Sequence, residues 1–365
     1  MPRTERGSGL ADDGRLRGLN AKMEVSTIGL DIAKSVFQVH GVDESGATVI
    51  RRQVRRRHLL GFFEKQAPCL VGMEACATSH YWARQIAALG HEVRLMPPHY
   101  VKPYVKRNKN DMADAEAICE AVTRPTMRFV APKSEEQQSV LVLHRSRELL
   151  VKQRTMLANA IRAHVAEFGI VAPRGIPRVK ELLAVIAEPD DERLPPGART
   201  CLEGLARQFG SLHVEIRAAE KRIHALHRSN ETSQRLATIP GIGPIIATAL
   251  AASITDPSVF KNGRELAAWV GLVPRQSSTG GKERLGRISK QGDQYLRWLL
   301  VAGAMSVIKS AKRRETTKRP WLDELIAKKP IKVAAVALAN KMARTAWALL
   351  SHGGTYREPV VAAAS

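Results

Sequence analysis

The stretch STIGLDIAK, residues 26–34, places one acidic residue at the end of an otherwise apolar run. A short apolar run of this kind predicts a buried strand, and Asp31 stands where that strand ends. The run CLVGMEAC, residues 69–76, repeats the arrangement with Glu74. A carboxylate at the end of a buried strand loses hydration unless a partner neutralises it. Hard Mg²⁺ prefers such oxygens, so both acids are candidate metal ligands.

A second pair of acids lies in KRNKNDMADAEAI, residues 106–118, after several cationic side chains. Asp111 and Asp114 are three residues apart, which puts both on one face of a predicted helix. A single acid at a strand end is more often a turn or capping residue than a ligand. Four acids in such settings could together hold two Mg²⁺ ions, one activating an oxygen nucleophile and one stabilising the leaving oxygen.

The composition indicates a polyanionic partner. The chain of 365 residues carries 57 Lys and Arg against 35 Asp and Glu, a net charge of +22, with a pI near 10.3. This surplus favours nucleic acid as the partner. The four cysteines have no CxxC spacing and the histidines no HxxxH spacing, which disfavours a zinc site and suits a reducing cytosol. No apolar run reaches the length of a membrane span.

Alternating patterns predict an N-terminal domain with a mixed sheet. Residues 25–33, 35–42 and 47–54 form a predicted β-meander, and CLVGME and HEVRLMPP are two further strands separated by helical segments. Strands that alternate with helices favour a sheet covered by helices. The 22 polar residues before Met23 are expected to be disordered, and translation may begin at either Met1 or Met23.

Two long helices are predicted next, over residues 134–168 and about 202–236, with a connection broken by proline and glycine between them. Such a pair is typical of an antiparallel hairpin that acts as a spacer or dimerisation arm. Apolar residues recur three and four apart along the first helix, including Leu150 and Leu157. This stripe has no evident partner in the rest of the sequence, so it predicts self-association.

The segment LATIPGIGPIIATAL, residues 236–250, contains a glycine turn between two apolar helices. Amides around Gly241 and Gly243, with the following helix N-terminus, could bind a phosphate. A tight turn between packed helices explains the same pattern equally well. Residues 261–345 carry 19 Lys and Arg against six Asp and Glu, a net charge of +13, which favours contact with nucleic acid.

A polar stretch, PRQSSTGGKERLGRISKQGD, follows and carries candidate nucleophiles. Ser277, Ser278 and Thr279 precede two glycines. The candidate cations beside them are Lys282, Arg284, Arg287 and Lys290. A hydroxyl here could attack a phosphodiester while the cations hold the developing charge. Alternatively, the loop only wraps phosphates, and the sequence by itself favours this second reading.

Taken together, the motifs GLDIAK, VGMEA, KNDMADAEAI, IPGIG and GLVPRQSSTGGKERLGRISKQGDQYLRWLL resemble the IS110-type transposases, or DEDD recombinases, and more closely the IS1111-like subgroup. The resemblance covers residues 24–353. It implies an α/β RuvC-like (ribonuclease H-like) N-terminal domain, a helical coiled-coil arm and a mainly α-helical C-terminal transposase domain. It also implies that Asp31, Glu74, Asp111 and Asp114 bind Mg²⁺.

The resemblance further implies that a serine forms a covalent phosphoserine link to DNA, in a composite site completed by a partner subunit's acids. It implies DNA as donor and target, a non-coding guide RNA and a homo-oligomer, dimer or tetramer. The implied location is the bacterial cytoplasm, in association with the nucleoid. Counting back from ISK favours Ser278, whereas counting forward from Pro274 reaches Thr279. We choose Ser278, because the β-branch of threonine crowds the attacking oxygen.

The expected division is a disordered extension (1–23), the RuvC-like domain (24–130), the arm (131–236), the C-terminal domain with IPGIG and the serine loop (237–353), and a tail (354–365). Two alternative functions remain open. One is a hydrolytic RuvC-type nuclease, in which water attacks and Ser278 only contacts phosphate. The other is a non-catalytic DNA-binding protein, which leaves the four acids unexplained.

Overall fold

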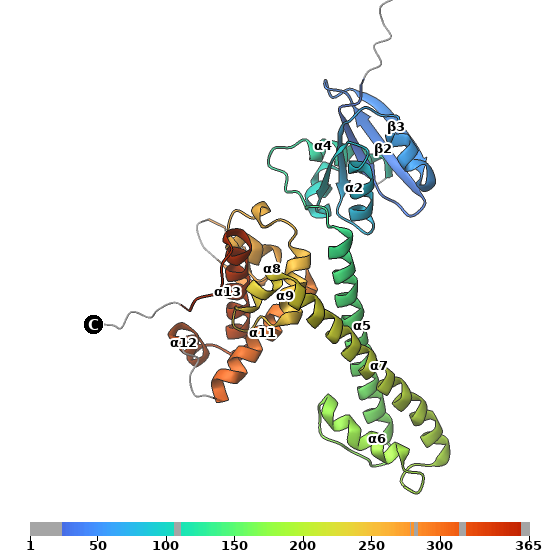
Figure 1. Ribbon diagram of the computed structural model, residues 1–365, viewed down its shortest axis with the longest axis vertical. Coiled ribbons are helices and arrows are strands. Elements are labelled where there is room, and N and C mark those ends of the chain that lie inside the picture. Colours follow the sequence, from blue (N-terminus) through green and yellow to red (C-terminus); the bar gives the residue numbers. More distant parts are fainter. Residues whose placement is uncertain (1–23, 106–110, 278, 281–283, 314–318, 359–365) are drawn as a thin grey trace, which may run out of the picture. The chain divides into compact units, whose positions relative to one another are not determined.

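The computed structural model describes residues 24–105, 111–277, 279–280, 284–313 and 319–358, without the side chains of Asp111 and Lys312 (Figure 1). The chain divides into two compact units, Met1–Pro132 and Lys133–Ser365. Ser278 and Lys282 lie outside the described residues. The finer division into extension, domain, arm, domain and tail stays a prediction.

The first unit contains a five-stranded mixed sheet in the order β3-β2-β1-β4-β5. Its strands are β1 (Thr27–Asp31), β2 (Val36–Val42), β3 (Thr48–Arg55), β4 (Leu70–Glu74) and β5 (Glu92–Met96). β1, β2 and β3 pair antiparallel, while β1, β4 and β5 pair parallel. The predicted meander and both later strands are therefore confirmed.

Helices cover both faces of this sheet (Figure 1). α1 (Leu59–Phe63) and α2 (Ser79–Ala87) share a core with the apolar residues of one face, such as Ile28 and Leu30. α4 (Asp111–Val122) lies against the other face. α4 can approach β1 closely because Gly29 has no side chain; a Cβ there would lie 2.1 Å from Ala115 O. Short turns complete the unit: η1 (Arg56–His58), α3 (Pro98–Val101) and η2 (Lys102–Tyr104).

The second unit begins with two long packed helices, α5 (Glu135–Ala166) and α7 (Pro196–Ser229). Ser134 and Gln137 form a capping box that starts α5, because each side chain accepts the other residue's backbone N–H. The helices run antiparallel, since Arg147 pairs with Glu220 while residues near the other end of α5 meet the start of α7. A coiled-coil supercoil for this pair stays a prediction.

Two details of this region differ from the sequence-based expectation. α7 ends at Ser229 instead of continuing to Leu236, because the Asn230 side chain accepts the Ser233 N–H and caps α8 (Glu231–Ala237). The connection holds a further helix, α6 (Val179–Ala187), after η3 (Ile176–Arg178). The prolines and glycines lie outside this helix, so they bound it without breaking it.

The predicted stripe on α5 is covered within the chain over its C-terminal part, contrary to expectation. Ile161 and Val165 are buried in a core shared with α6 and α7, and Leu157 packs against it. Val142, Leu149 and Met156 lie seven residues apart on α5, each more than half exposed. The exposed apolar surface of α5 therefore includes Leu149 of the predicted stripe and two residues outside it.

The rest of the second unit is a helical cluster with one small hairpin (Figure 1). Its helices are α9 (Pro244–Ser253), η4 (Pro257–Val259), α10 (Gly263–Trp269), α11 (Gln294–Arg313), α12 (Pro320–Lys328) and α13 (Ile331–His352). The hairpin joins β6 (Pro274–Gln276) to β7 (Leu285–Ile288) and was not predicted. Throughout the described part of the chain, no helix has the length and apolarity to cross a membrane.

Candidate active site

Asp31 and Glu74 lie side by side at the ends of neighbouring parallel strands. The β1–β4 register pairs Leu30 with Met73, so each acid is the next residue along its strand. Gly29 and Gly72, two residues before them, face α4, and alternation puts both acids on that same face. α4 starts with the segment that carries Asp111 and Asp114. The fold therefore brings acids from three distant segments to one edge of the sheet.

The charges of Asp31 and Asp114 act on Glu74. Burial raises the pKa of Glu74, and the nearby negative charges of Asp31 and Asp114 raise it further. The pKa of the Cys76 thiol is also raised, first by burial and then by Glu74 and Asp31. Converging carboxylates repel one another unless a proton or a cation compensates.

The donor set has the chemistry of a divalent-cation site. Every acid offers hard oxygen ligands, and a cation would relieve the repulsion that raises the pKa of Glu74. Among the described side chains alone, no group of three His, Cys, Asp or Glu is arranged to hold an ion. The side chain of Asp111, the fourth acid, is not among them.

Two of the candidate nucleophiles, Ser277 and Thr279, lie between the strands of the β6–β7 hairpin in the other unit, and both are exposed. Pro274 pairs with Ile288 and Gln276 with Leu285, and the Ser277 N–H donates to Arg284 O at 3.0 Å. Ser277 and Arg284 therefore mark the end of the ladder. Of the predicted cations, Arg284, Arg287 and Lys290 are exposed on or beside this hairpin.

The base of the hairpin is firmly attached to the helical cluster. Gly271 and Gly292 permit a close crossing there, because a Cβ on Gly292 would lie 1.8 Å from Trp269 O. Arg297 Nη1 donates to Val270 O at 2.8 Å and to Gln291 O at 2.9 Å. The exposed tip thus stands on a fixed base, as an attacking group requires.

The two glycines of the IPGIG turn differ in their surroundings, because helix packing requires a glycine at Gly241 but not at Gly243. Gly241 has a φ of 92°, and a Cβ there would lie 3.0 Å from Gly303 O on α11. Gly243 is exposed, and a Cβ on it would meet nothing within 4 Å. Close helix packing therefore accounts for Gly241, and phosphate binding at either glycine stays a prediction.

Comparison with known proteins identifies the family. A family described as "Transposase" matches residues 28–170, and the "Transposase IS116/IS110/IS902 family" matches residues 233–319. The chain is 49% identical over 336 residues to a "Probable family 20 transposase" of Pseudomonas aeruginosa, covering 92% of this chain and 99% of that one. The chain belongs to the IS110 family of transposases.

Two further relatives place this transposase in the IS1111-like subgroup. It is 42% identical to the transposase for insertion sequence element IS1328 of Yersinia enterocolitica, over 91% of this chain and 98% of the relative. It is 40% identical to the transposase for IS1111A of Coxiella burnetii, over 92% of each. It is therefore an insertion-sequence transposase, an enzyme that acts on DNA. Its DEDD domain is RuvC-like, and that family typically uses a divalent metal.

The structure adds a residue of the transposase that the sequence analysis did not single out. Gln38 is paired with Asp31 across the β1–β2 ladder, so the two side chains share a face of the sheet. It is buried, and its Oε1 has no hydrogen-bond partner among the described residues. The available signal was the strand SVFQVHGV, in which Gln38 interrupts an apolar run.

Proposed function

We propose that this transposase cuts and rejoins DNA through a covalent link to Ser278, assisted by Mg²⁺ on Asp31, Glu74, Asp111 and Asp114. The observation that carries the proposal is the hairpin, which stands on a fixed base and exposes two hydroxyl residues, Ser277 and Thr279. A water-activating nuclease has no need of a positioned hydroxyl in a second unit. Counting back from ISK, together with the crowding β-branch of threonine, makes Ser278 the first choice and Thr279 its rival.

The covalent step exchanges one phosphodiester for another. Ser278 Oγ forms a bond to phosphorus and loses its proton, while one P–O bond of the DNA strand breaks and the leaving oxygen gains a proton. The hydroxyl of another strand then attacks the phosphoserine and restores Ser278. Each step replaces one ester by another, so rejoining needs no external energy source.

The cations around the hairpin have a defined task in this scheme. Arg284 and Arg287 are exposed beside the tip, where their guanidinium groups can hold the non-bridging phosphate oxygens as charge builds up. Lys282, which lies outside the described residues, and Lys290 add positive charge along the same loop. Gly243 is proposed as a further phosphate contact, since its backbone is open to approach.

The carboxylates act from the other compact unit. When bound, Mg²⁺ would supply Lewis-acid stabilisation of the phosphate and of the departing oxygen. Asp31 and Glu74 are fixed in place for this by their strands, and Asp114 by α4. From the family resemblance we infer that acids of one subunit serve the serine of another in a homo-oligomer, and the division of the acids and the hairpin between two compact units is compatible with it.

A non-coding guide RNA is the second nucleic-acid partner that we propose. It follows from the family resemblance, and the net charge of +22 supports it because two polyanions must be held at once. Sequencing the RNA that copurifies with the protein tests this point directly. Recovery of random cellular RNA, without an enriched transcript of the insertion element, would contradict it.

The decisive experiment is a search for the protein–DNA adduct. Labelled donor DNA is incubated with the protein, its RNA and Mg²⁺, and the products are resolved on a denaturing gel. The adduct should form with wild type and with Ser277→Ala, and disappear with Ser278→Ala. An adduct that survives Ser278→Ala but vanishes with Thr279→Ala moves the nucleophile by one position. DNA cleavage without an adduct in any variant would instead establish the hydrolytic nuclease.

A further inference from the structure

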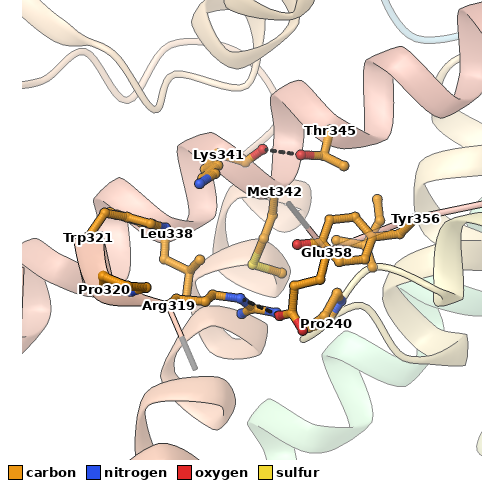
Figure 2. Close-up of a pocket in the computed structure, with 11 residues that line it drawn as sticks. Pro240, Arg319, Pro320, Trp321, Leu338, Lys341, Met342, Thr345, Tyr356 and Glu358 are labelled. Carbon is orange, nitrogen blue, oxygen red and sulfur yellow. Dashed lines mark hydrogen bonds and ion pairs between the residues drawn. The ribbon is translucent and has the colours of Figure 1, made fainter. Parts of the chain in front are cut away.

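A small cavity lies between the IPGIG turn, α12 and α13, among residues that the proposed mechanism does not use (Figure 2). Its volume is about 80 Å³. Apolar groups form much of its wall, with two cations among them; those drawn in Figure 2 include Pro240, Trp321, Leu338, Met342, Arg319 and Lys341. A single water needs about 10–15 Å³ by this measure, so the cavity has room for several waters.

The C-terminal segment lines one side of this cavity and is held there by two polar contacts. The Tyr356 N–H donates to Thr238 Oγ1 at 2.9 Å, next to the IPGIG turn. Arg319 donates to Glu358 Oε1 from Nε at 3.0 Å and from Nη2 at 2.8 Å (Figure 2). The side chain of Arg319 is only 12% exposed, whereas that of Glu358 is 48% exposed. The carboxylate is therefore the more exchangeable member of the pair.

Positive charge gathers on the wall opposite this carboxylate. Lys341 Nζ lies 4.4 Å from the centre of the Trp321 ring, a cation–π contact. The pKa of Lys341 is lowered by burial first and then by the positive charges of Arg319 and Arg344. Additional negative charge at this place would relieve that repulsion.

Trp321 and Tyr356 add aromatic surface to the same cavity. The Trp321 Nε1 is buried and has no hydrogen-bond partner among the described residues. Tyr356 lies beside Met342 and Glu358, so an aromatic ring and an anion stand next to each other on the tail (Figure 2). A base and its phosphate present the same pair of features, and proteins bind single strands by combining stacking surfaces with cations.

We propose that this cavity is a binding subsite for single-stranded nucleic acid, which Tyr356 and Glu358 occupy until a strand displaces them. A phosphate takes the place of the Glu358 carboxylate on Arg319, and an unstacked base takes the place of the Tyr356 ring. The inference rests on the proposed function only in that nucleic acid is the ligand. The free volume of about 80 Å³ is too small for a nucleotide while Tyr356 and Glu358 are in place, so these residues and the nucleic-acid strand compete for the site.

Competition of this kind is measurable by fluorescence anisotropy with a labelled single-stranded oligonucleotide and the full chain. Glu358→Gln should tighten binding by roughly three- to tenfold, because Arg319 loses the carboxylate with which a phosphate competes for its guanidinium. The matched control is Glu215→Gln, which removes an equal charge at an exposed position of α7. It should change the affinity by less than about twofold.

Arg319→Gln completes a double-mutant cycle. It should have little effect while Glu358 is present, and should abolish the gain when combined with Glu358→Gln. Tyr356→Ala is an independent variant that should also tighten binding, should Arg319→Gln fail to fold. An affinity of Glu358→Gln equal to that of Glu215→Gln, with Tyr356→Ala also unchanged, would overturn the inference. Loss of the Ser278 adduct bears only on the proposed function, so the two failures are distinguishable.

Discussion

In the first unit Asp31 and Glu74 end strands that α4 contacts directly, whereas in the second unit the candidate nucleophiles Ser277 and Thr279 lie between the strands of a two-stranded hairpin. The acids owe their positions to the close packing of α4 on the sheet, where a Cβ added to Gly29 would lie only 2.1 Å from Ala115 O. The hairpin is fixed at its base and exposed at its tip. A metal site needs several ligands held together, while a nucleophile must reach a strand of DNA. The two constructions suit these different tasks.

The largest effect should come from removing a single acid. Asp31→Asn and Glu74→Gln should each lower cleavage by roughly a thousandfold or more, because the acids act as one unit. In the absence of metal, each variant should melt at the same temperature as wild type or higher, since the substitution relieves the repulsion that raises the pKa of Glu74. Wild type should gain thermal stability on adding Mg²⁺ or Mn²⁺, and the variants should not. A variant that retains both cleavage and metal-induced stabilisation would exclude its residue from the site.

The contrast in packing can be tested with one pair of glycines. Gly29→Ala should lower the free energy of unfolding by about 3 kcal/mol, because the new methyl group collides with the α4 backbone. Gly286→Ala on β7 should change it by less than about 0.5 kcal/mol, since its Cβ would lie 3.6 Å from Arg275 O, an ordinary contact. Urea denaturation of the two variants measures this. Equal destabilisation by both would show that the two regions are packed alike.

The strands and acids of the first unit were largely predictable from the sequence, whereas the hairpin of the second unit was not. The key strands of the first unit are short apolar runs, and an acid at the end of such a run carries its own signal. The β6–β7 hairpin has no such run, so its polar glycine-rich sequence predicts only a loop. Gln38 beside Asp31, and Tyr356 beside Thr238, depend on pairings that only the folded chain reveals. The site roles of all these residues stay predictions.

The attachment of α5 to the helical cluster should depend on pH. His144 is fully buried, with Nδ1 3.0 Å from the Tyr295 hydroxyl and Nε2 3.0 Å from Thr248 Oγ1. Thr248 already donates its proton to Pro244 O, so its oxygen accepts from Nε2–H and Nδ1 accepts from Tyr295. Burial, followed by Arg147 and Arg145, lowers the pKa of His144 to about 4.

The sign of the effect follows from these two protonation states. Between pH 6.5 and about 4 the unfolded chain binds a proton on this histidine and the folded chain does not, so stability falls as the pH falls. The loss amounts to at most about 3 kcal/mol at the lower end. His144→Gln should be less stable at neutral pH but should show a shallower loss on acidification. Parallel stability–pH curves for the two proteins would refute this account.

Disrupting self-association through the long helices should change the stability of the fold less than the substitution of His144 does. The exposed stripe of α5 contains Leu149 and Met156, whereas Leu157 packs against a core within the chain. Leu149→Glu with Met156→Glu should therefore yield smaller particles by light scattering, with melting temperatures near that of wild type. Leu157→Glu should instead lower the melting temperature. If the wild-type protein with its RNA is a monomer, the composite site is excluded as well.

The smallest effect is expected from single cations of the hairpin, and it is best seen as a change in salt dependence. Each phosphate that a protein neutralises releases condensed counterions, so the slope of log affinity against log salt reports the number of contacts. Arg284→Ala and Arg287→Ala should each weaken DNA binding and reduce that slope by about one. Arg217→Ala, at an exposed position of α7, removes an equal charge away from the hairpin and should leave the slope unchanged. Equal slopes for all three variants would mean that the hairpin does not touch the DNA backbone, and the attack by Ser278 would then lose the cations on which it depends.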